Sequence, residues 1–371
     1  YIGPGTGYMI SWVYWLTWTA TLGTEFTAAA LLMQEWFPHI SMWIWTIIFA
    51  ITIFALNLSS TRIFAESEFW LALVKVVTVV AFIFSLIPFH GAESAPLFHN
   101  LTAQGWFPQG LVPIFTTMLI VNFAFSGTEL IGVAAGETKD PAVNVPKAIN
   151  AAIWRLLIFF VGTIVVISAL LPFQVAGLGG ESVSNSPFVT VFNYIGIPYA
   201  DDIMRFVIIT ALLSAANSGL YAASRMMWSL SAQRQLPQVF SRLSSSGTPI
   251  IALVVTMFGA IPGLLSEHFA PETIFKNLLG IAAFTMVIVW MSICWSQFNF
   301  RRAWYKAGHS AKDLKFAAPL YPIVPILGFV FCFITGLSMA ADPEMQAGFI
   351  GCLLFIAACY LSHYIFYRDR T

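Results

Sequence analysis

The feature that most constrains this chain is a succession of apolar runs, many of them about 20 residues or longer, from one end to the other. A helix needs about 20 mostly apolar residues to cross a bilayer. The runs do not alternate polar and apolar residues, so strands of a membrane barrel are not expected. The sequence predicts membrane-spanning helices at residues 8–33, 41–60, 68–88, 111–135, 149–172, 202–230, 249–266, 274–297, 319–340 and 346–367.

The composition points to the same class of protein. Only 9% of the 371 residues are charged and 58% are hydrophobic, whereas soluble domains carry about 25% charged residues. Basic and acidic residues balance at 17 each, which argues against a nucleic-acid partner. The chain is expected to be one all-α integral membrane domain over residues 1–371, with the lipid bilayer as its surroundings.

Lysine and arginine predict the orientation. They occur in the loops at 60–67, 137–150, 225–248 and 299–318 and in the tail, and are absent from the alternate loops at 34–40, 89–110, 173–200, 267–273 and 341–345. Cytoplasmic loops carry the excess of positive charge, so the first span is expected to start inside. The cysteines, Cys294, Cys332, Cys352 and Cys359, have no paired spacing, so no metal, cofactor or disulfide framework is indicated.

Four ionisable residues interrupt the apolar runs: Glu25, Lys75, Glu129 and Arg205. An ion inside a bilayer is costly, so such residues usually face the bundle interior. Arg205 is expected to pair with Asp201, four residues earlier on the same helix. The others have a structural and a functional interpretation each.

Lys75 either extends its ammonium toward the headgroups or takes up and releases a proton as the protein changes shape. Glu25 shares a helix face with Trp18 and Thr21, and either bonds to a neighbouring helix or balances a cationic substrate. Glu129 follows Gly127, which marks either close packing or a broken helix whose free backbone groups bind a substrate. A small polar patch is typical of close helix packing; it includes Ser214, Asn217 and Ser218.

Several runs together resemble the amino acid transporter family of the amino acid–polyamine–organocation superfamily. The most specific is FSGTELIGVAAGETKDPAVNVPKAI (125–149), and WLTWTATLGTEFTAAALLMQEWFP (15–38), STRIFAESEFWLALVKVVT (60–78), LLSAANSGLYAASRMMWSLS (212–231) and APLYPIVPILGF (318–329) occur in the family's order. The finer likeness is to bacterial S-methylmethionine permeases. The family implies a LeuT-like fold of two inverted five-helix repeats plus two helices, and the ten predicted spans would match the third to twelfth of its twelve. The chain begins at Tyr1 without Met or a signal peptide, so it is expected to lack the first two.

The resemblance also implies roles for residues. The span 111–135 would be a broken helix whose unwound part binds the substrate backbone through Phe123, Ala124, Phe125, Ser126, Gly127 and Thr128. Phe123 would cover the substrate from outside. Trp18, Thr21 and Glu25, which share one helix face of the span 8–33, are further candidates for substrate binding. Lys75 would occupy the place of a sodium ion and couple a proton, facing the patch at Ser214, Asn217 and Ser218, and Glu129 would steady or couple the break.

The sequence and the resemblance thus predict a proton-coupled amino acid importer of the bacterial cytoplasmic membrane, not an enzyme, with S-methylmethionine as the expected substrate. An aromatic wall with a carboxylate suits the sulfonium of S-methylmethionine. It suits lysine, arginine or histidine as well, and a neutral amino acid remains a further alternative. A channel would need a selectivity loop or a ring of like charges, and a membrane enzyme would need a cluster of catalytic side chains. Neither pattern occurs, and the six histidines are scattered.

Overall fold

The computed structural model describes residues 1–59, 61–85, 110–172, 186–265, 271–343 and 345–367, together with residues 100, 102, 105 and 107. Throughout these residues the regular elements are helices. The long helices are α1 (Pro4–Trp36), α2 (Met42–Leu58), α3 (Thr61–Phe84), α5 (Val112–Phe123), α7 (Pro141–Leu156), α11 (Ala200–Ala232), α14 (Pro271–Lys306), α15 (Ile323–Ala341) and α16 (Gln346–Phe366). The shorter ones are α6 (Leu130–Val133), η2 (Ala134–Glu137), η3 (Leu157–Val161), α8 (Gly162–Leu170), α10 (Pro187–Tyr194), η4 (Gln238–Ser241), α12 (Ile250–Thr256), η5 (Met257–Ala260), α13 (Ile261–Leu265) and η6 (Ala311–Asp313).

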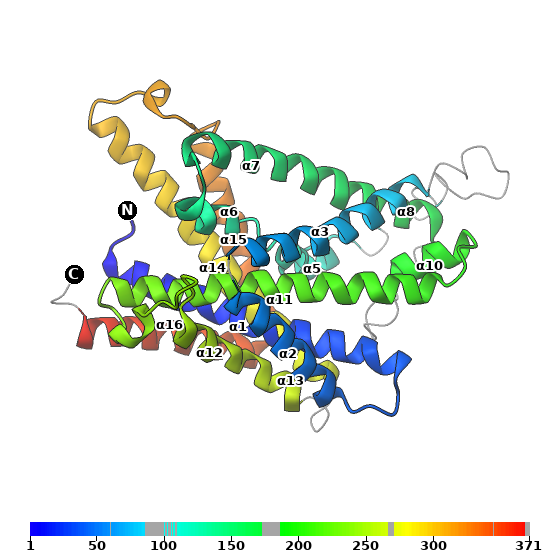
Figure 1. Cartoon of the computed structure of the whole chain (residues 1–371). Coiled ribbons are helices and arrows are strands. Elements are labelled where there is room, and N and C mark those ends of the chain that lie inside the picture. Colours follow the sequence, from blue (N-terminus) through cyan, green and yellow to red (C-terminus); the bar gives the residue numbers. More distant parts are fainter. Residues whose placement is uncertain are drawn as a thin grey trace.

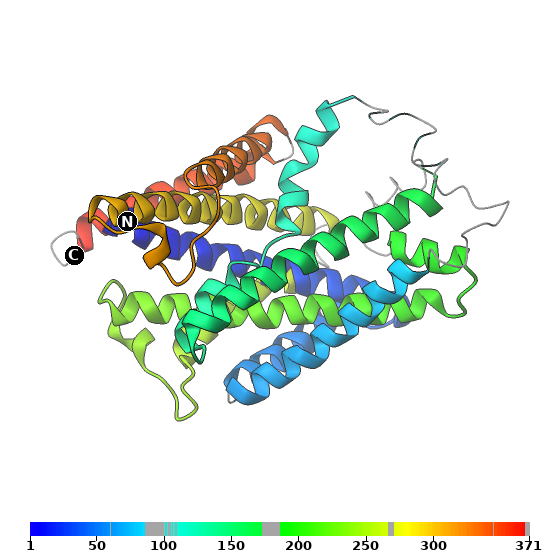
Figure 2. The same ribbon diagram turned by 90° about the horizontal axis from the view of Figure 1, so that it is seen from above.

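Helices α1 and α11 form the centre of the molecule. They have 33 residues each and lie side by side, with α14 and α16 also against α1 (Figure 1). Seen from above, α7 and α8 cross over α11 (Figure 2). Much of α1 is buried although it contains several threonines, because each hydroxyl bonds to the carbonyl four residues earlier and so is satisfied within the helix. These residues are Thr17, Thr21, Thr24 and Thr27.

Glycines let α1 approach the segment 257–265 closely. A Cβ on Gly259 would lie 2.4 Å from the backbone oxygen of Thr19, and one on Gly23 would lie 2.8 Å from the backbone oxygen of Gly259. Small residues at such crossings allow backbones to pack directly in membrane helices. The contact fixes α1 against α13 and η5.

We expect Gly259→Val to destabilise the fold. The new side chain meets a carbonyl of α1 that cannot move without shifting the helix, and overpacking of this kind costs about 1–3 kcal/mol. The melting temperature in detergent, followed by fluorescence-detected gel filtration, measures the effect. Gly351→Val is the control, because a Cβ there meets nothing within 4 Å. Equal melting temperatures for the two variants would contradict this account of the crossing.

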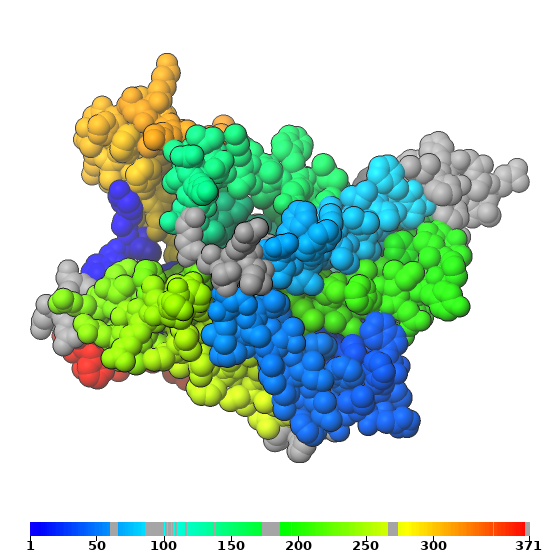
Figure 3. Space-filling model, in the orientation of Figure 1, coloured from blue at the N-terminus to red at the C-terminus, as the bar shows by residue number. Residues whose placement is uncertain are grey.

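Six helices of the described residues are long and apolar enough to cross a membrane, and two apolar helices, Met42–Leu58 and Ile250–Leu265, are shorter. Large apolar side chains such as Trp154, Leu327 and Phe366 are exposed on them, as expected for helices surrounded by lipid. On the face in Figure 3, α2 lies between α3 and α12 and contacts both. The six are Glu66–Phe84, Pro141–Leu170, Ala200–Ala232, Ile274–Lys306, Ile323–Ala341 and Gln346–Phe366. Of these, Pro141–Leu170 is the continuous helix formed by α7, η3 and α8.

Several helix limits differ from the ranges predicted from hydropathy. The helix predicted at 149–172 begins at Pro141, where proline suits the first turn because its missing N–H has no partner there. Helix α14 continues to Lys306, into the predicted loop 299–318. Arg301 lies over the rings of Tyr305 and Tyr321, at 5.3 and 5.2 Å, so its charge is compatible with burial.

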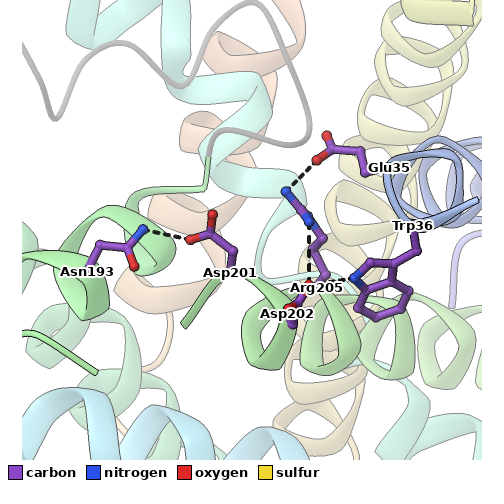
Figure 4. A network of polar contacts seen from close by, with 6 residues as sticks. All are labelled: Glu35, Trp36, Asn193, Asp201, Asp202 and Arg205. Carbon is purple, nitrogen blue, oxygen red and sulfur yellow. Dashed lines mark hydrogen bonds and ion pairs between the residues drawn. The ribbon is translucent and has the colours of Figure 1, made fainter. Parts of the chain in front are cut away.

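The prediction that Arg205 pairs with Asp201 is wrong. Its guanidinium pairs with Glu35 at the end of α1, with Nη2 2.5 Å from Oε2, and Nη1 lies 3.6 Å from Oδ1 of Asp202 (Figure 4). Asp201 instead accepts a hydrogen bond from Asn193 at 2.6 Å. The tertiary contact overrides the local spacing because the end of α1 brings a second carboxylate to the start of α11.

Candidate functional site

The segment predicted at 111–135 is interrupted in the middle. Helix α5 ends at Phe123 and α6 begins at Leu130, and the residues between them form turns. Gly127 has φ +93°, a left-handed conformation that glycine adopts without steric cost. The break thus lies in the segment where the resemblance implies an unwound stretch. Beside it, Phe160 in the π-helix η3 stacks on Phe125, with ring centroids 4.5 Å apart.

Glu129 holds the break in place. One carboxylate oxygen accepts from the Tyr14 hydroxyl at 3.2 Å. The other accepts from the backbone N–H of Gly127 at 3.0 Å and from Nε1 of Trp290 at 3.3 Å. A carboxylate offers about four acceptor positions, so these three donors leave room for a further one. The carboxylate joins the break to α1 and α14.

A cavity of about 490 Å³ lies against this break. Among the described residues that line it, Glu129 alone carries a charge. Asn122 also lines it and is buried, and its Nδ2 is enclosed in the protein rather than exposed to the cavity. The walls are otherwise mostly apolar: Phe125, Thr128, Ile131, Ile149, Ala152, Ile153, Leu156, Trp290, Ile293, Cys294 and Cys332.

A second polar cluster joins α3, α11 and α2. Lys75 Nζ donates to the Ser214 hydroxyl at 2.7 Å, and that hydroxyl donates to Oε1 of Glu68. Asn217 Nδ2 donates to the other oxygen of Glu68 at 3.1 Å, and Asn57 Nδ2 donates to Oδ1 of Asn217 at 2.8 Å. Ser214 and Asn217 are fully buried. We call Lys75, Ser214, Glu68, Asn217 and Asn57 the lysine cluster.

Lys75 also lines a separate cavity of about 350 Å³ together with Glu25. Glu25 is buried on α1, and its Oε2 has no partner among the described residues. The cavity therefore contains a carboxylate and an ammonium with mainly apolar side chains around them. Opposite charges attract more strongly in such surroundings than in water.

The residues predicted for substrate binding fall in different places. Phe125 and Thr128 line the cavity at the break, and Phe123 packs into an apolar cluster beside it. Trp18 packs edge to face against Tyr14, with ring centroids 6.1 Å apart. The Thr21 hydroxyl is bonded to its own helix. The turn also contains Ala124 and Ser126, whose N–H groups bond to carbonyls of α5.

Of the predicted coupling residues, Lys75, Ser214 and Asn217 belong to the lysine cluster. Ser218 follows them on α11 and is half-buried. Sequence reasoning missed Glu68 and Asn57. Glu68 lies seven residues before Lys75, two helical turns away on the same face, and this spacing could have identified it. Tyr14 and Trp290 were missed because nothing in a single sequence relates them to Glu129.

Known proteins are similar to this sequence along its length. The family model for amino acid permeases matches residues 1–371. A putative histidine permease of Bacillus subtilis is 45% identical over all of this chain and 78% of the relative. The amino-acid permease RocC of the same species is 44% identical over 100% of this chain and 79% of its own. The lysine-specific permease LysP of Escherichia coli is 38% identical over 96% and 76%. With its apolar helices, the chain therefore belongs to the amino acid permease family and is a multi-pass membrane transporter, not an enzyme.

Proposed function

We propose that this permease imports a basic amino acid together with a proton. The observation that carries the substrate class is the Glu129 carboxylate, which alone among the described lining residues carries a charge on the cavity at the break, in walls that are otherwise mostly apolar. A cationic side chain entering this cavity would find one compensating carboxylate, which a buried cation needs.

The names of the relatives favour basic amino acids over S-methylmethionine, the substrate implied by the resemblance to S-methylmethionine permeases. The relatives described above are named for histidine, for lysine or for amino acids in general, and none of them is named for S-methylmethionine. S-methylmethionine also carries a positive charge and so fits the same cavity by electrostatics alone. Basic amino acids are the better proposal because the charge and the relatives agree on them.

We assign the proton to Lys75, whose Nζ donates to Ser214 and which lines a cavity together with Glu25. Lysine can be neutral as well as charged, which arginine in proteins cannot. The transport cycle would take place in a LeuT-like bundle of the ten spans expected from the sequence, in a bacterial cytoplasmic membrane. The break at 124–129 would bind the α-amino and carboxylate groups of the substrate.

Competition for uptake tests the substrate class. Purified protein in liposomes, with the outside more acidic, takes up labelled histidine while unlabelled lysine, arginine, leucine or S-methylmethionine is added in turn. We expect lysine and arginine to compete and leucine not to compete. Competition by leucine alone would contradict the proposal. Competition by S-methylmethionine alone would instead support S-methylmethionine as the substrate.

A further inference from the structure

The lysine cluster contains a carboxylate, Glu68, to which the proposed coupling gives no role. We propose that Glu68 receives the proton of Lys75 through the Ser214 hydroxyl and passes it toward the cytoplasm. The proposal rests on the proposed function, since it describes how the coupled proton leaves. Three features support it: the donor order, the fixed position of the carboxylate and the location along α3.

The chemistry of the three groups permits one donor order. An ammonium only donates hydrogen bonds and a carboxylate only accepts them, whereas a hydroxyl does both. Ser214 must therefore accept from Lys75 and donate to Glu68, as the geometry shows. The proton transfer follows this order. Nζ gives a proton to the Ser214 oxygen while that hydroxyl gives its own to Oε1 of Glu68, so the charged pair becomes a neutral amine and a carboxylic acid.

The Glu68 carboxylate is held by a second set of bonds. Asn217 Nδ2 donates to its other oxygen, and Oδ1 of Asn217 is bound by Asn57. The Asn57 amide in turn donates to the carbonyl of Ile53 at 3.1 Å. This series of hydrogen bonds fixes the Asn217 amide with its nitrogen toward Glu68. The acceptor oxygen is thus positioned before any proton arrives, and positioning of this kind promotes proton transfer.

Glu68 lies on the side of Lys75 expected to be cytoplasmic. Helix α3 begins at Thr61, within the segment 60–67 that contains Arg62 and is predicted as a cytoplasmic loop, and seven residues of helix advance about 10 Å. Glu68 is therefore nearer the cytoplasmic end of α3 than Lys75 is. Glu68 is half-buried, whereas Ser214 is fully buried. The other charges that act on Lys75 are Glu25 on α1 and Arg155 on α7. Glu25 lines the cavity with Lys75, and its Oε2 has no hydrogen-bond partner among the described residues, so it is not part of the hydrogen-bonded relay.

Accumulation and exchange distinguish the relay from a structural role. Liposomes with a pH difference of about one unit and a clamped membrane potential support about tenfold accumulation at one proton per substrate, since 1.4 kcal/mol is a factor of ten. Counterflow of labelled histidine against unlabelled histidine needs no net proton transfer. We expect Glu68→Gln and Ser214→Ala to keep counterflow and to lose accumulation. Glu66→Gln, on the same helix and exposed, is the matched control and should keep both.

Each outcome decides the proposal. Accumulation by Glu68→Gln at the wild-type level would overturn the relay. Loss of both counterflow and accumulation would also overturn it, because Glu68 would then be needed for the fold or for substrate binding. A wild-type protein that exchanges substrate but never responds to the pH difference would contradict the proposed proton coupling itself, so the two failures are distinct.

Discussion

Replacing Lys75 by methionine is expected to abolish accumulation driven by a pH difference while substrate exchange continues. The ammonium is the group that would carry the proton, and Met keeps most of the length of the side chain without a titratable nitrogen. Ser214 can still donate to Glu68 and Asn217 still holds it, so the contact between α3 and α11 persists. The accumulation ratio should fall from about tenfold per pH unit to equality, measured with labelled histidine in liposomes.

Lys75→Arg separates a mobile proton from a fixed charge. Arginine keeps the positive charge beside Ser214 and Glu25 but does not release its proton in proteins. We expect this variant to lose accumulation as fully as Lys75→Met. If Lys75→Arg accumulates histidine like the unmodified protein, the side chain supplies only charge and the coupling proton is held elsewhere.

The second large effect is expected from Glu129→Gln. The substitution removes the charge that Glu129 alone contributes among the described residues that line the cavity at the break. The glutamine oxygen can still accept from the N–H groups of Gly127 and Trp290, with its NH2 toward the Tyr14 hydroxyl, so the loss of charge is the main change. Hydrogen bonds to charged groups contribute about 1.5–3 kcal/mol, so affinity for lysine should fall about 10- to 150-fold. Protection of Cys294 against a thiol reagent measures this affinity, because Cys294 lines the cavity and is half-buried while the other described cysteines are buried.

Tyr14→Phe is the matched control for Glu129. It removes one of the three donors and leaves the charge, so affinity for lysine should fall less than in Glu129→Gln. The account requires that Glu129→Gln weakens binding of lysine more than binding of a neutral amino acid. Equal weakening of both would mean that the carboxylate only supports the break.

The positions of the helices follow largely from hydropathy. Helix α16 (Gln346–Phe366) and α2 (Met42–Leu58) lie within the predicted ranges 346–367 and 41–60, because polar residues or glycine and proline flank a continuous apolar run. The ends of α7 and α14 could not be predicted in this way. Amphipathic turns beyond the apolar run continue these helices, and hydropathy does not register them.

The candidate site was predictable where a charge stands in an apolar run. Lys75 and Glu129 stand out because their burial requires partners. The partners themselves come from other helices: Tyr14 from α1, Trp290 from α14 and Ser214 from α11. Which helix faces meet depends on the packing of the whole bundle. A single sequence contains the polar residues but not these pairings.

The most direct test of the central claim is to measure proton entry together with substrate entry. Liposomes that contain the protein and a pH-sensitive dye are given lysine or histidine from outside at equal starting pH, with the membrane potential clamped. The account predicts that the lumen acidifies when the substrate is added, that leucine has no such effect, and that Lys75→Met abolishes it. Entry of labelled lysine with no change in lumenal pH would contradict proton-coupled import.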